Sequence, residues 1–133
     1  GVMIADVVYT KDSYDHRFLL LNAGMNDLMR PALYDAYHHV LPMVQSNAEL
    51  VPQDLAGPIC ESTDVFAKQR PLPPMVEGAQ LAFGTAGAYC AVLANHYHGR
   101  ALPAEALLED DGTARLIRPA VSDEDMIARE QAL

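Results

Sequence analysis

Short runs of apolar and β-branched residues, separated by polar turns, follow one another along the first part of the chain. Val2 to Thr10 is apolar with Asp6 as its one charge, Lys11 to His16 is polar, and Arg17 to Ala23 is apolar again. Two such runs joined by a short polar loop predict a β-hairpin.

The next stretch, GMNDLMRPALYDAYHHVLP, carries mixed signals. Asn26 and Asp27 are good helix starters, but Pro31 biases Arg30 away from the helical region. We therefore expect a helical turn or two rather than a long helix, followed by a strand near His38 to Val44.

Three more segments have the pattern of strands. We expect a loop at 45–54 and then extended residues from Leu55 to Cys60, a strand from Ala79 to Phe83, and a buried strand from Tyr89 to Ala94. The segment KQRPLPP has three prolines in seven residues. It cannot be a central strand, because proline lacks the N–H that a sheet ladder requires.

The C-terminal part predicts a hairpin and then a helix. Ala104 to Leu108 and Ala114 to Ile117 flank the turn-forming EDDG. Ser122, with Asp125 three residues later, resembles a capping box in which Asp replaces the usual Glu or Gln, so we expect a helix over 123–131.

Many short strands, frequent turns and one late helix indicate a mainly β fold, an antiparallel β-sandwich or Greek-key barrel with short helices and a C-terminal helix. A chain of 133 residues is about one domain, and it is long enough to bury a core. Because GVMIADVVYT resembles a strand entered from upstream, we expect domain 1–133 to be part of a longer chain.

The net charge of −9 argues against a nucleic-acid partner, which needs clustered Lys and Arg. No apolar run approaches the roughly 20 residues that span a bilayer, and no signal peptide is visible, so no membrane partner is expected. The two cysteines, Cys60 and Cys90, match no zinc spacing. A single disulfide would fit, but we favour a reduced cytoplasmic protein.

The motif GPICESTD places a thiol and a carboxylate side by side after a Gly-Pro pair. Neighbouring side chains of a strand point to opposite faces, so only an irregular loop could direct Cys60 and Glu61 into one pocket. A thiol can act as proton donor or nucleophile. The plain alternative is a small buried hydrophobe followed by a surface acid.

Two further places offer polar chemistry. Arg30 and Tyr34 would share one face of a helical turn, where a guanidinium and a hydroxyl can hold a carboxylate; the alternative is a surface arginine packed on a ring. Tyr89 follows the small residues of TAGAY, which allow close approach to a ligand such as a phosphate; the alternative is a core aromatic residue. A metal pair at His96 and His98 lacks an obvious third ligand.

The chain resembles the C-terminal domain of the diaminopimelate decarboxylase family in three segments, which occur in the order NAGMNDLMRPALYDAYH, GPICESTD and TAGAY. The later segment RALPAEALLEDDGTARLIRP fits this family as well. The resemblance covers about Val2 to Ile127. Glutamate after the cysteine, combined with NDLxRPxLY, is specific within this family, since ornithine-type relatives usually carry aspartate there.

The resemblance implies an enzyme of the alanine-racemase-like class that depends on pyridoxal 5'-phosphate. Its N-terminal (β/α)8 barrel, absent from this chain, holds the cofactor through a lysine. The active site forms at a homodimer interface and converts meso-diaminopimelate to L-lysine and carbon dioxide in lysine biosynthesis. As given, the chain is expected to be inactive, because Lys11 and Lys68 lie in polar loops and resemble no cofactor lysine.

The resemblance also implies a role for each candidate residue. Arg30 and Tyr34 match substrate-binding positions, and Glu61 matches a substrate-binding carboxylate. Cys60 matches the proton donor that acts after decarboxylation, and it enters the partner subunit's site together with Glu61. Tyr89 matches a tyrosine that touches both the substrate and the phosphate region of the cofactor.

This implied reaction agrees with the residue chemistry. Diaminopimelate has a second amino-acid end, so its site needs a cation for the distal carboxylate and an anion for the distal ammonium, which Arg30 and Glu61 can supply. Asn22 and Thr85 stand where the family usually has aspartate, and neither is assigned to chemistry. A related decarboxylase for another amino acid and a free-standing binding or regulatory module remain as alternatives.

Overall fold

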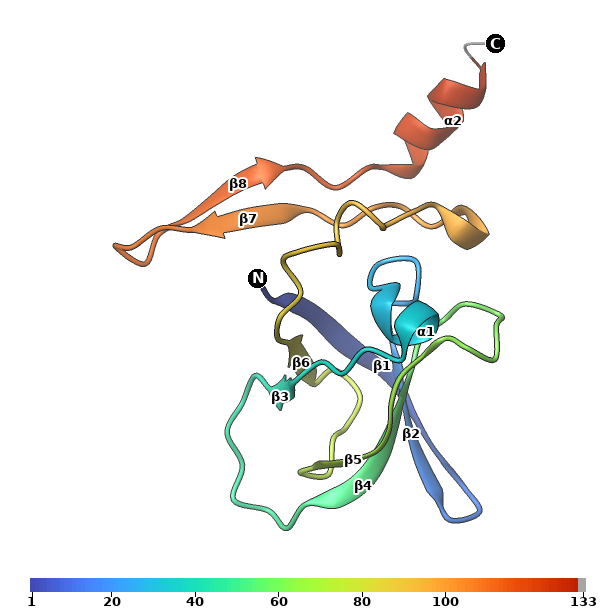
Figure 1. Ribbon diagram of the computed structural model, residues 1–133, viewed down its shortest axis with the longest axis vertical. Helices are drawn as coiled ribbons and strands as arrows, with labels where there is room; N and C mark the ends of the chain where they lie inside the picture. Colours follow the sequence, from blue (N-terminus) through green and yellow to red (C-terminus); the bar gives the residue numbers. More distant parts are fainter. Residues whose placement is uncertain (132–133) are drawn as a thin grey trace. The chain divides into compact units, whose positions relative to one another are not determined.

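The structure, a computed structural model, describes residues 1–131, which form two units. The first unit is Gly1–Ala94 and the second begins at Asn95. The first unit contains these elements in chain order: β1 (Met3–Ser13), β2 (His16–Leu21), α1 (Arg30–Tyr34), β3 (Val40–Pro42), β4 (Val51–Ala56), β5 (Val65–Leu72) and β6 (Gln80–Phe83) (Figure 1). The second contains a 3-10 turn (Tyr97–Gly99), β7 (Glu105–Leu108), β8 (Ala114–Arg118) and α2 (Asp123–Gln131).

The strands of the first unit form a six-stranded sheet in the order β3-β6-β1-β2-β4-β5. All neighbouring pairs are antiparallel except β2 and β4, which run parallel. A parallel pair needs a long crossover, and here the connection passes through α1 and β3. The predicted mainly β fold is confirmed, with one parallel pair that the sequence pattern did not indicate.

The predicted N-terminal hairpin is confirmed as β1 and β2, and its strands extend further than expected. Residues 11–13 belong to β1 rather than to a loop, so the turn shortens to Tyr14 and Asp15. Tyr14 adopts a left-handed φ of 52°, which tight hairpin turns require. A bulge between Val7 and Tyr9 shifts the register in which β1 pairs with β2.

The core lies on the inner face of this sheet. Alternate residues of β2 and β6 are fully buried, among them Leu19, Leu21, Leu81 and Phe83. The Phe83 ring packs against that of Phe66 on β5, with 5.0 Å between their centroids. These contacts across the sheet fix which face of each strand turns inward, because a slip of one residue would expose the whole apolar set.

The proline-rich segment forms part of β5, at the edge of the sheet. The prediction that it cannot be a central strand is therefore confirmed. The prediction for the preceding segment was partly wrong: β4 starts at Val51, within the predicted loop, and ends at Ala56, before the GPICESTD motif. Gly57 and Pro58 end the extended run because proline cannot continue the hydrogen-bonded ladder.

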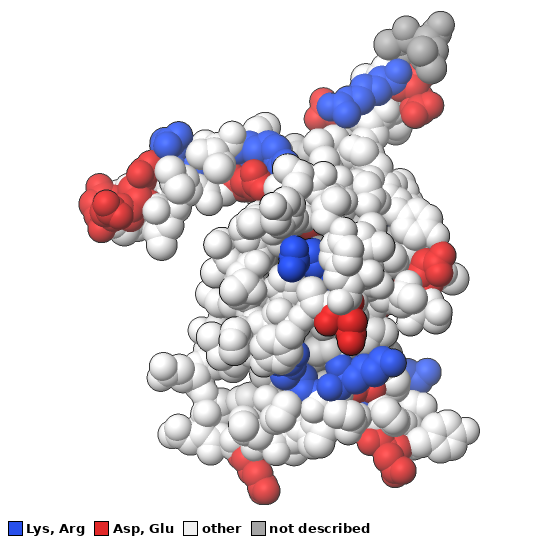
Figure 2. All heavy atoms as spheres, viewed as in Figure 1, with Lys and Arg blue, Asp and Glu red and all other residues white. Residues whose placement is uncertain are grey.

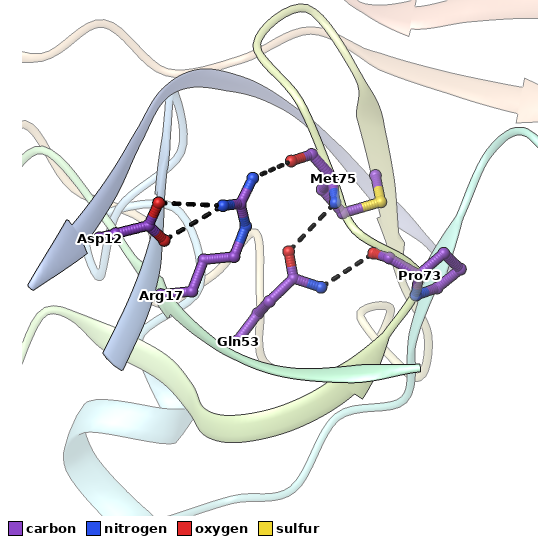
Figure 3. Close-up of polar contacts among 5 residues, drawn as sticks. All are labelled: Asp12, Arg17, Gln53, Pro73 and Met75. Atoms are coloured by element: carbon purple, nitrogen blue, oxygen red, sulfur yellow. Dashed lines mark hydrogen bonds and ion pairs between the residues drawn. The ribbon is translucent and has the colours of Figure 1, made fainter. Parts of the chain in front are cut away.

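Gln53 anchors the loop that follows β5 (Figure 3). Its side chain is fully buried, and its Nε2 donates to the carbonyl oxygens of Leu72 and Pro73 at 3.1 and 2.9 Å. Its Oε1 accepts the Met75 N–H at 3.1 Å, while Arg17 donates to the Met75 carbonyl at 3.1 Å. One glutamine thus satisfies three backbone groups in a loop whose prolines provide few donors of their own.

The predicted buried strand from Tyr89 to Ala94 is wrong. These residues form consecutive turns, in which the Cys90 carbonyl accepts the N–H groups of Leu93 and Ala94 at 3.1 and 3.0 Å. Tyr89 has a left-handed φ of 62°, which lies outside the extended region of a regular strand. Within this apolar segment Cys90 is buried, whereas Tyr89 and Val92 are exposed.

The second unit agrees with its prediction. β7 and β8 form the expected hairpin, with Gly112 at a φ of 84° in the turn. Acidic side chains gather at the tip of this hairpin (Figure 2). Ser122 and Asp125 form the predicted capping box of α2, each backbone N–H donating to the other's side chain at 3.1 and 3.0 Å. Among residues 1–131, no helix is long and apolar enough to cross a membrane.

Asp54 on β4 joins three elements through a buried carboxylate. It accepts the Gln69 backbone N–H at 2.6 Å and the His16 Nδ1–H at 2.6 Å. Burial raises the pKa of Asp54, but hydrogen bonds from Gln69 and His16 outweigh it, so the pKa lies below the usual value for aspartate. The ionised carboxylate therefore stabilises the folded chain.

This arrangement predicts a loss of stability in acid. The pKa of Asp54 is lower in the folded chain than in the unfolded chain, where it is about 3.9. Its contribution to the free energy of unfolding is therefore fully present above the unfolded-state pKa and is lost as the pH falls through the folded-state pKa. Urea unfolding between pH 3 and pH 7 measures the effect. The free energy of unfolding should fall with acidification less steeply in Asp54→Asn than in the wild type. Identical pH profiles would contradict this role, and Asp15→Asn, at the exposed β-turn, is the control.

Candidate functional site

The short helix α1 places Arg30 and Tyr34 on one face. Pro31 occupies the first turn of α1, where its missing N–H costs no hydrogen bond. Asp35 ends the helix in the left-handed conformation, with a φ of 53°. The Arg30 Cζ lies 6.0 Å from the centroid of the Tyr34 ring. The predicted juxtaposition of these two residues within a helical turn is confirmed.

Tyr89 approaches the same arginine from a distant part of the sequence. The Arg30 Cζ lies 6.0 Å from the centroid of the Tyr89 ring, the same distance as from Tyr34. Both rings are largely exposed, at 65% for Tyr89 and 62% for Tyr34. One guanidinium therefore lies near two exposed phenol rings. We call Arg30, Tyr34 and Tyr89 the arginine cluster; its donors can hold a carboxylate or a phosphate oxygen.

Cys90, the residue after Tyr89, is buried. Burial raises the pKa of the Cys90 thiol, although the positive charge of Arg30 opposes the shift. Its Sγ is directed to the Ala88 carbonyl at 3.6 Å. Cys90 therefore behaves as a small core residue rather than as a reactive thiol.

Cys60 and Glu61 lie on the irregular loop that joins β4 to β5, residues 57–64, and both are exposed. The Gly57 N–H donates to the Asp64 carbonyl at 3.0 Å, and the Asp64 N–H donates to the Glu61 carbonyl at 3.1 Å. The expectation that an irregular loop carries this pair is confirmed. Within the described part of the chain, no hydrogen bond or ion pair links Cys60 to the arginine cluster.

Asp64 ends this loop, and its side chain is almost entirely buried, at 2% exposure. Its Oδ2 accepts the Ile59 N–H at 2.7 Å, and its Oδ1 accepts the Met25 N–H at 2.6 Å. Asp64 was not among the residues that the sequence singled out. Its position after Ser and Thr gave no signal that it would reach across to another segment.

Asn22 and Thr85 each form side-chain hydrogen bonds with neighbouring groups. Asn22 Nδ2 donates to Asp6 Oδ2 and its Oδ1 accepts the Asp6 N–H, both at 2.8 Å. An aspartate in place of Asn22 could not donate to Asp6. Thr85 Oγ1 donates to the Gly84 carbonyl at 2.7 Å, and His38 Nδ1 donates to the same oxygen at 3.0 Å.

The two lysines lie on strands and not in the polar loops that the sequence predicted. Lys11 on β1 and Lys68 on β5 are both exposed, whereas a lysine that binds a cofactor covalently is held within its pocket. His96 in the second unit contacts the Arg100 carbonyl at 2.8 Å through Nδ1. Among residues 1–131, no group of three or more His, Cys, Asp or Glu side chains could hold a metal ion.

The described residues thus form a mainly β domain that exposes an arginine–tyrosine cluster and a Cys-Glu loop. The family model for the C-terminal sheet domain of pyridoxal-dependent decarboxylases matches residues 1–87, more than half of the chain. The chain therefore belongs to the pyridoxal-dependent decarboxylase family.

Three relatives of this chain within the family carry the same name. Diaminopimelate decarboxylase of Zymomonas mobilis is 40% identical over 131 residues, covering 98% of this chain and 31% of that protein. The enzyme of the same name from Aquifex aeolicus is 41% identical over 118 residues, covering 89% and 28%. The crystal structure of diaminopimelate decarboxylase from Helicobacter pylori complexed with L-lysine has a TM-score of 0.89 at 37% identity, covering 99% and 32%. The chain thus spans about a third of these relatives.

The different burial of the two thiols gives a direct test of the site geometry. Treating the folded chain with N-ethylmaleimide should modify Cys60, which is exposed, and leave Cys90 unmodified. Peptide mapping by mass spectrometry locates the adduct, and Cys60→Ser should abolish it. A second adduct should form only in urea. Modification of Cys90 in the folded chain would contradict the burial of this thiol.

Proposed function

We propose that this chain is the C-terminal domain of a diaminopimelate decarboxylase, which converts meso-2,6-diaminopimelate to L-lysine and carbon dioxide. The observation that carries the proposal is the arginine cluster, in which Arg30 lies 6.0 Å from the rings of both Tyr34 and Tyr89. Relatives at about 40% identity that bear this name support it.

The arginine cluster suits the distal carboxylate of a substrate with two amino-acid ends. Arginine offers a planar fork of donors that matches a carboxylate, and the two phenol groups add donors beside it. Glu61 supplies the opposite charge for the distal ammonium. A substrate that lacks these distal groups would leave the charges of Arg30 and Glu61 without partners once the site has formed, which is a strong basis for discrimination.

Cys60 is the proposed proton donor. After carbon dioxide has left the substrate, a proton must take its place on the same carbon atom. A thiol on an exposed loop can deliver that proton at the mouth of a site without being held inside the pocket. Glu61, the adjacent residue on the loop, would at the same time hold the substrate's far end.

Pyridoxal 5'-phosphate fits the residues present only in part. When bound, it withdraws electrons from the reacting carbon and so makes loss of carbon dioxide feasible. The exposed Tyr89 hydroxyl beside Arg30 suits contact with its phosphate region. Among residues 1–131, neither Lys11 nor Lys68 forms a hydrogen bond or ion pair with a residue of the arginine cluster, and both are exposed. We propose that a lysine of an N-terminal barrel domain holds the cofactor, and that this chain alone does not.

A homodimer completes the proposed site. Cys60 and Glu61 lie on an exposed loop that is held by its own backbone hydrogen bonds. A loop that enters a partner subunit is expected to be exposed when its domain is seen alone. The two free thiols fit a reducing cytoplasmic setting. The partners that we propose are therefore the barrel domain of the same enzyme, a second copy of the enzyme, and a small-molecule substrate.

The full-length parent protein tests this proposal. It should release carbon dioxide from meso-diaminopimelate and much less from ornithine or arginine. Cys60→Ala should lower kcat by about 10²- to 10⁴-fold, the range that positioned proton donors contribute, while the absorbance of the bound cofactor stays unchanged. Glu61→Ala should mainly raise KM.

Cys90→Ala is the matched control, because it removes a thiol that is buried and takes no part in the proposed chemistry. Wild-type activity in Cys60→Ala would refute the proton-donor role. A preference for ornithine or arginine would instead indicate a related decarboxylase for another amino acid. If no substrate is decarboxylated, the domain acts as a binding module.

A further inference from the structure

Two segments that carry the candidate site residues meet at one buried carboxylate. Gly24 and Met25 lead into α1 and Arg30, while residues 57–64 carry Cys60 and Glu61. Asp64 bonds to both: its Oδ1 accepts the Met25 N–H at 2.6 Å and its Oδ2 accepts the Ile59 N–H at 2.7 Å. Each carboxylate oxygen thus holds one of the two segments.

A carboxylate with 2% exposure is tolerated only where donors replace water. Here both donors are backbone N–H groups, whose positions are fixed by the path of the chain. Backbone donors to a charged acceptor form short bonds that are about twice as strong as neutral ones. Asp64 therefore determines the separation between the segment before α1 and the Cys-Glu loop.

Two glycines show how closely the segments are packed around this carboxylate. A Cβ added at Gly57 would collide with the Asp64 carboxylate, which is the nearest group to it. A Cβ added at Gly24 would lie 3.0 Å from Ile59 Cγ1 and 3.1 Å from Pro58 Cδ. Neither glycine has a left-handed φ, so close packing is the reason that a side chain does not fit there.

We propose that Asp64 is a positioning residue that sets where the loop presents Cys60 and Glu61 relative to the segment that carries Arg30. The geometric part of this inference stands on the contacts of the chain itself. The consequence for catalysis rests on the proposed function. Asp64 acts through backbone N–H groups and does not itself touch the substrate.

The first experiment uses the chain of 133 residues and does not depend on enzyme activity. In Asp64→Asn, the amide group can accept only one of the two N–H groups, because its nitrogen is a donor. Hydrogen exchange measured by NMR should accelerate at the Met25 or Ile59 amide by about tenfold or more, the size expected when a bond to a buried charged group is lost. The central strand amide of Leu19 should change much less.

Asp54→Asn is the matched control. Asp54 is also a buried aspartate that accepts a backbone N–H, but it bonds to Gln69 and His16. It should lower stability without selectively accelerating exchange at Met25 and Ile59. If both variants accelerate these two amides equally, Asp64 contributes only general stability and the proposal is overturned.

A second variant keeps the test decisive if Asp64→Asn does not fold. Gly57→Ala leaves the carboxylate intact but displaces it, so it should accelerate exchange at the same two amides. Gly84→Ala is its control, because a Cβ there meets only ordinary contacts at 3.5 Å and beyond. Unchanged exchange at both amides in Gly57→Ala would contradict the proposal.

The full-length parent protein tests the catalytic consequence. Asp64→Asn should lower kcat by about tenfold or more with an unchanged absorbance of the bound cofactor, whereas Asp54→Asn should retain kcat. If the wild type decarboxylates no substrate, the proposed function fails while the exchange experiment still decides the positional role. Faster exchange with an unchanged kcat would overturn the catalytic part of the inference.

Discussion

The arrangement of the candidate site depends on one buried carboxylate that two distant segments share. Asp64 has almost no contact with solvent, so its charge must be met by protein donors, and the N–H groups of Met25 and Ile59 meet it. This requirement draws the residues before α1 against the loop that follows β4. The close packing at Gly24 and Gly57 follows from the same contact.

The sheet supports this contact without forming the site. Its strands bury their alternate residues in one core. Gln53 holds the proline-rich loop that follows β5 (Figure 3). The candidate chemical groups all lie outside the regular strands, on α1, on the loop 57–64 and on the turns that include Tyr89. A rigid sheet with reactive loops can present its side chains to another domain or subunit while remaining folded itself.

Local patterns in the sequence predicted the local elements well. Three of these features depend only on residues that are neighbours in sequence. They are the hairpin of β1 and β2, the capping box of Ser122 and Asp125, and the exclusion of the proline-rich segment from the centre of the sheet. Arg30 and Tyr34 were predicted together for the same reason. Cys60, Glu61 and Tyr89 were also candidates from their motifs, but the family resemblance supplied their roles, which composition and spacing alone left open.

Features that depend on contacts between distant segments were not predictable in this way. The parallel pairing of β2 with β4 is set by a crossover through α1 and β3, and the approach of Tyr89 to Arg30 by a left-handed turn. Tyr89 was placed on a buried strand because the residues around it are small and apolar. Asp64 was missed because a buried aspartate at the end of a loop has the same sequence pattern as an exposed one.

The central claim is that this domain supplies Cys60 to a site whose cofactor is held elsewhere, in a partner subunit. Subunit complementation in the full-length protein tests it most directly. One variant carries Cys60→Ala, and the other lacks the cofactor lysine of the barrel. Each variant should be inactive alone, and mixing them under conditions of subunit exchange should restore decarboxylation. If mixed dimers form, as native mass spectrometry can establish, and remain inactive, the claim is contradicted.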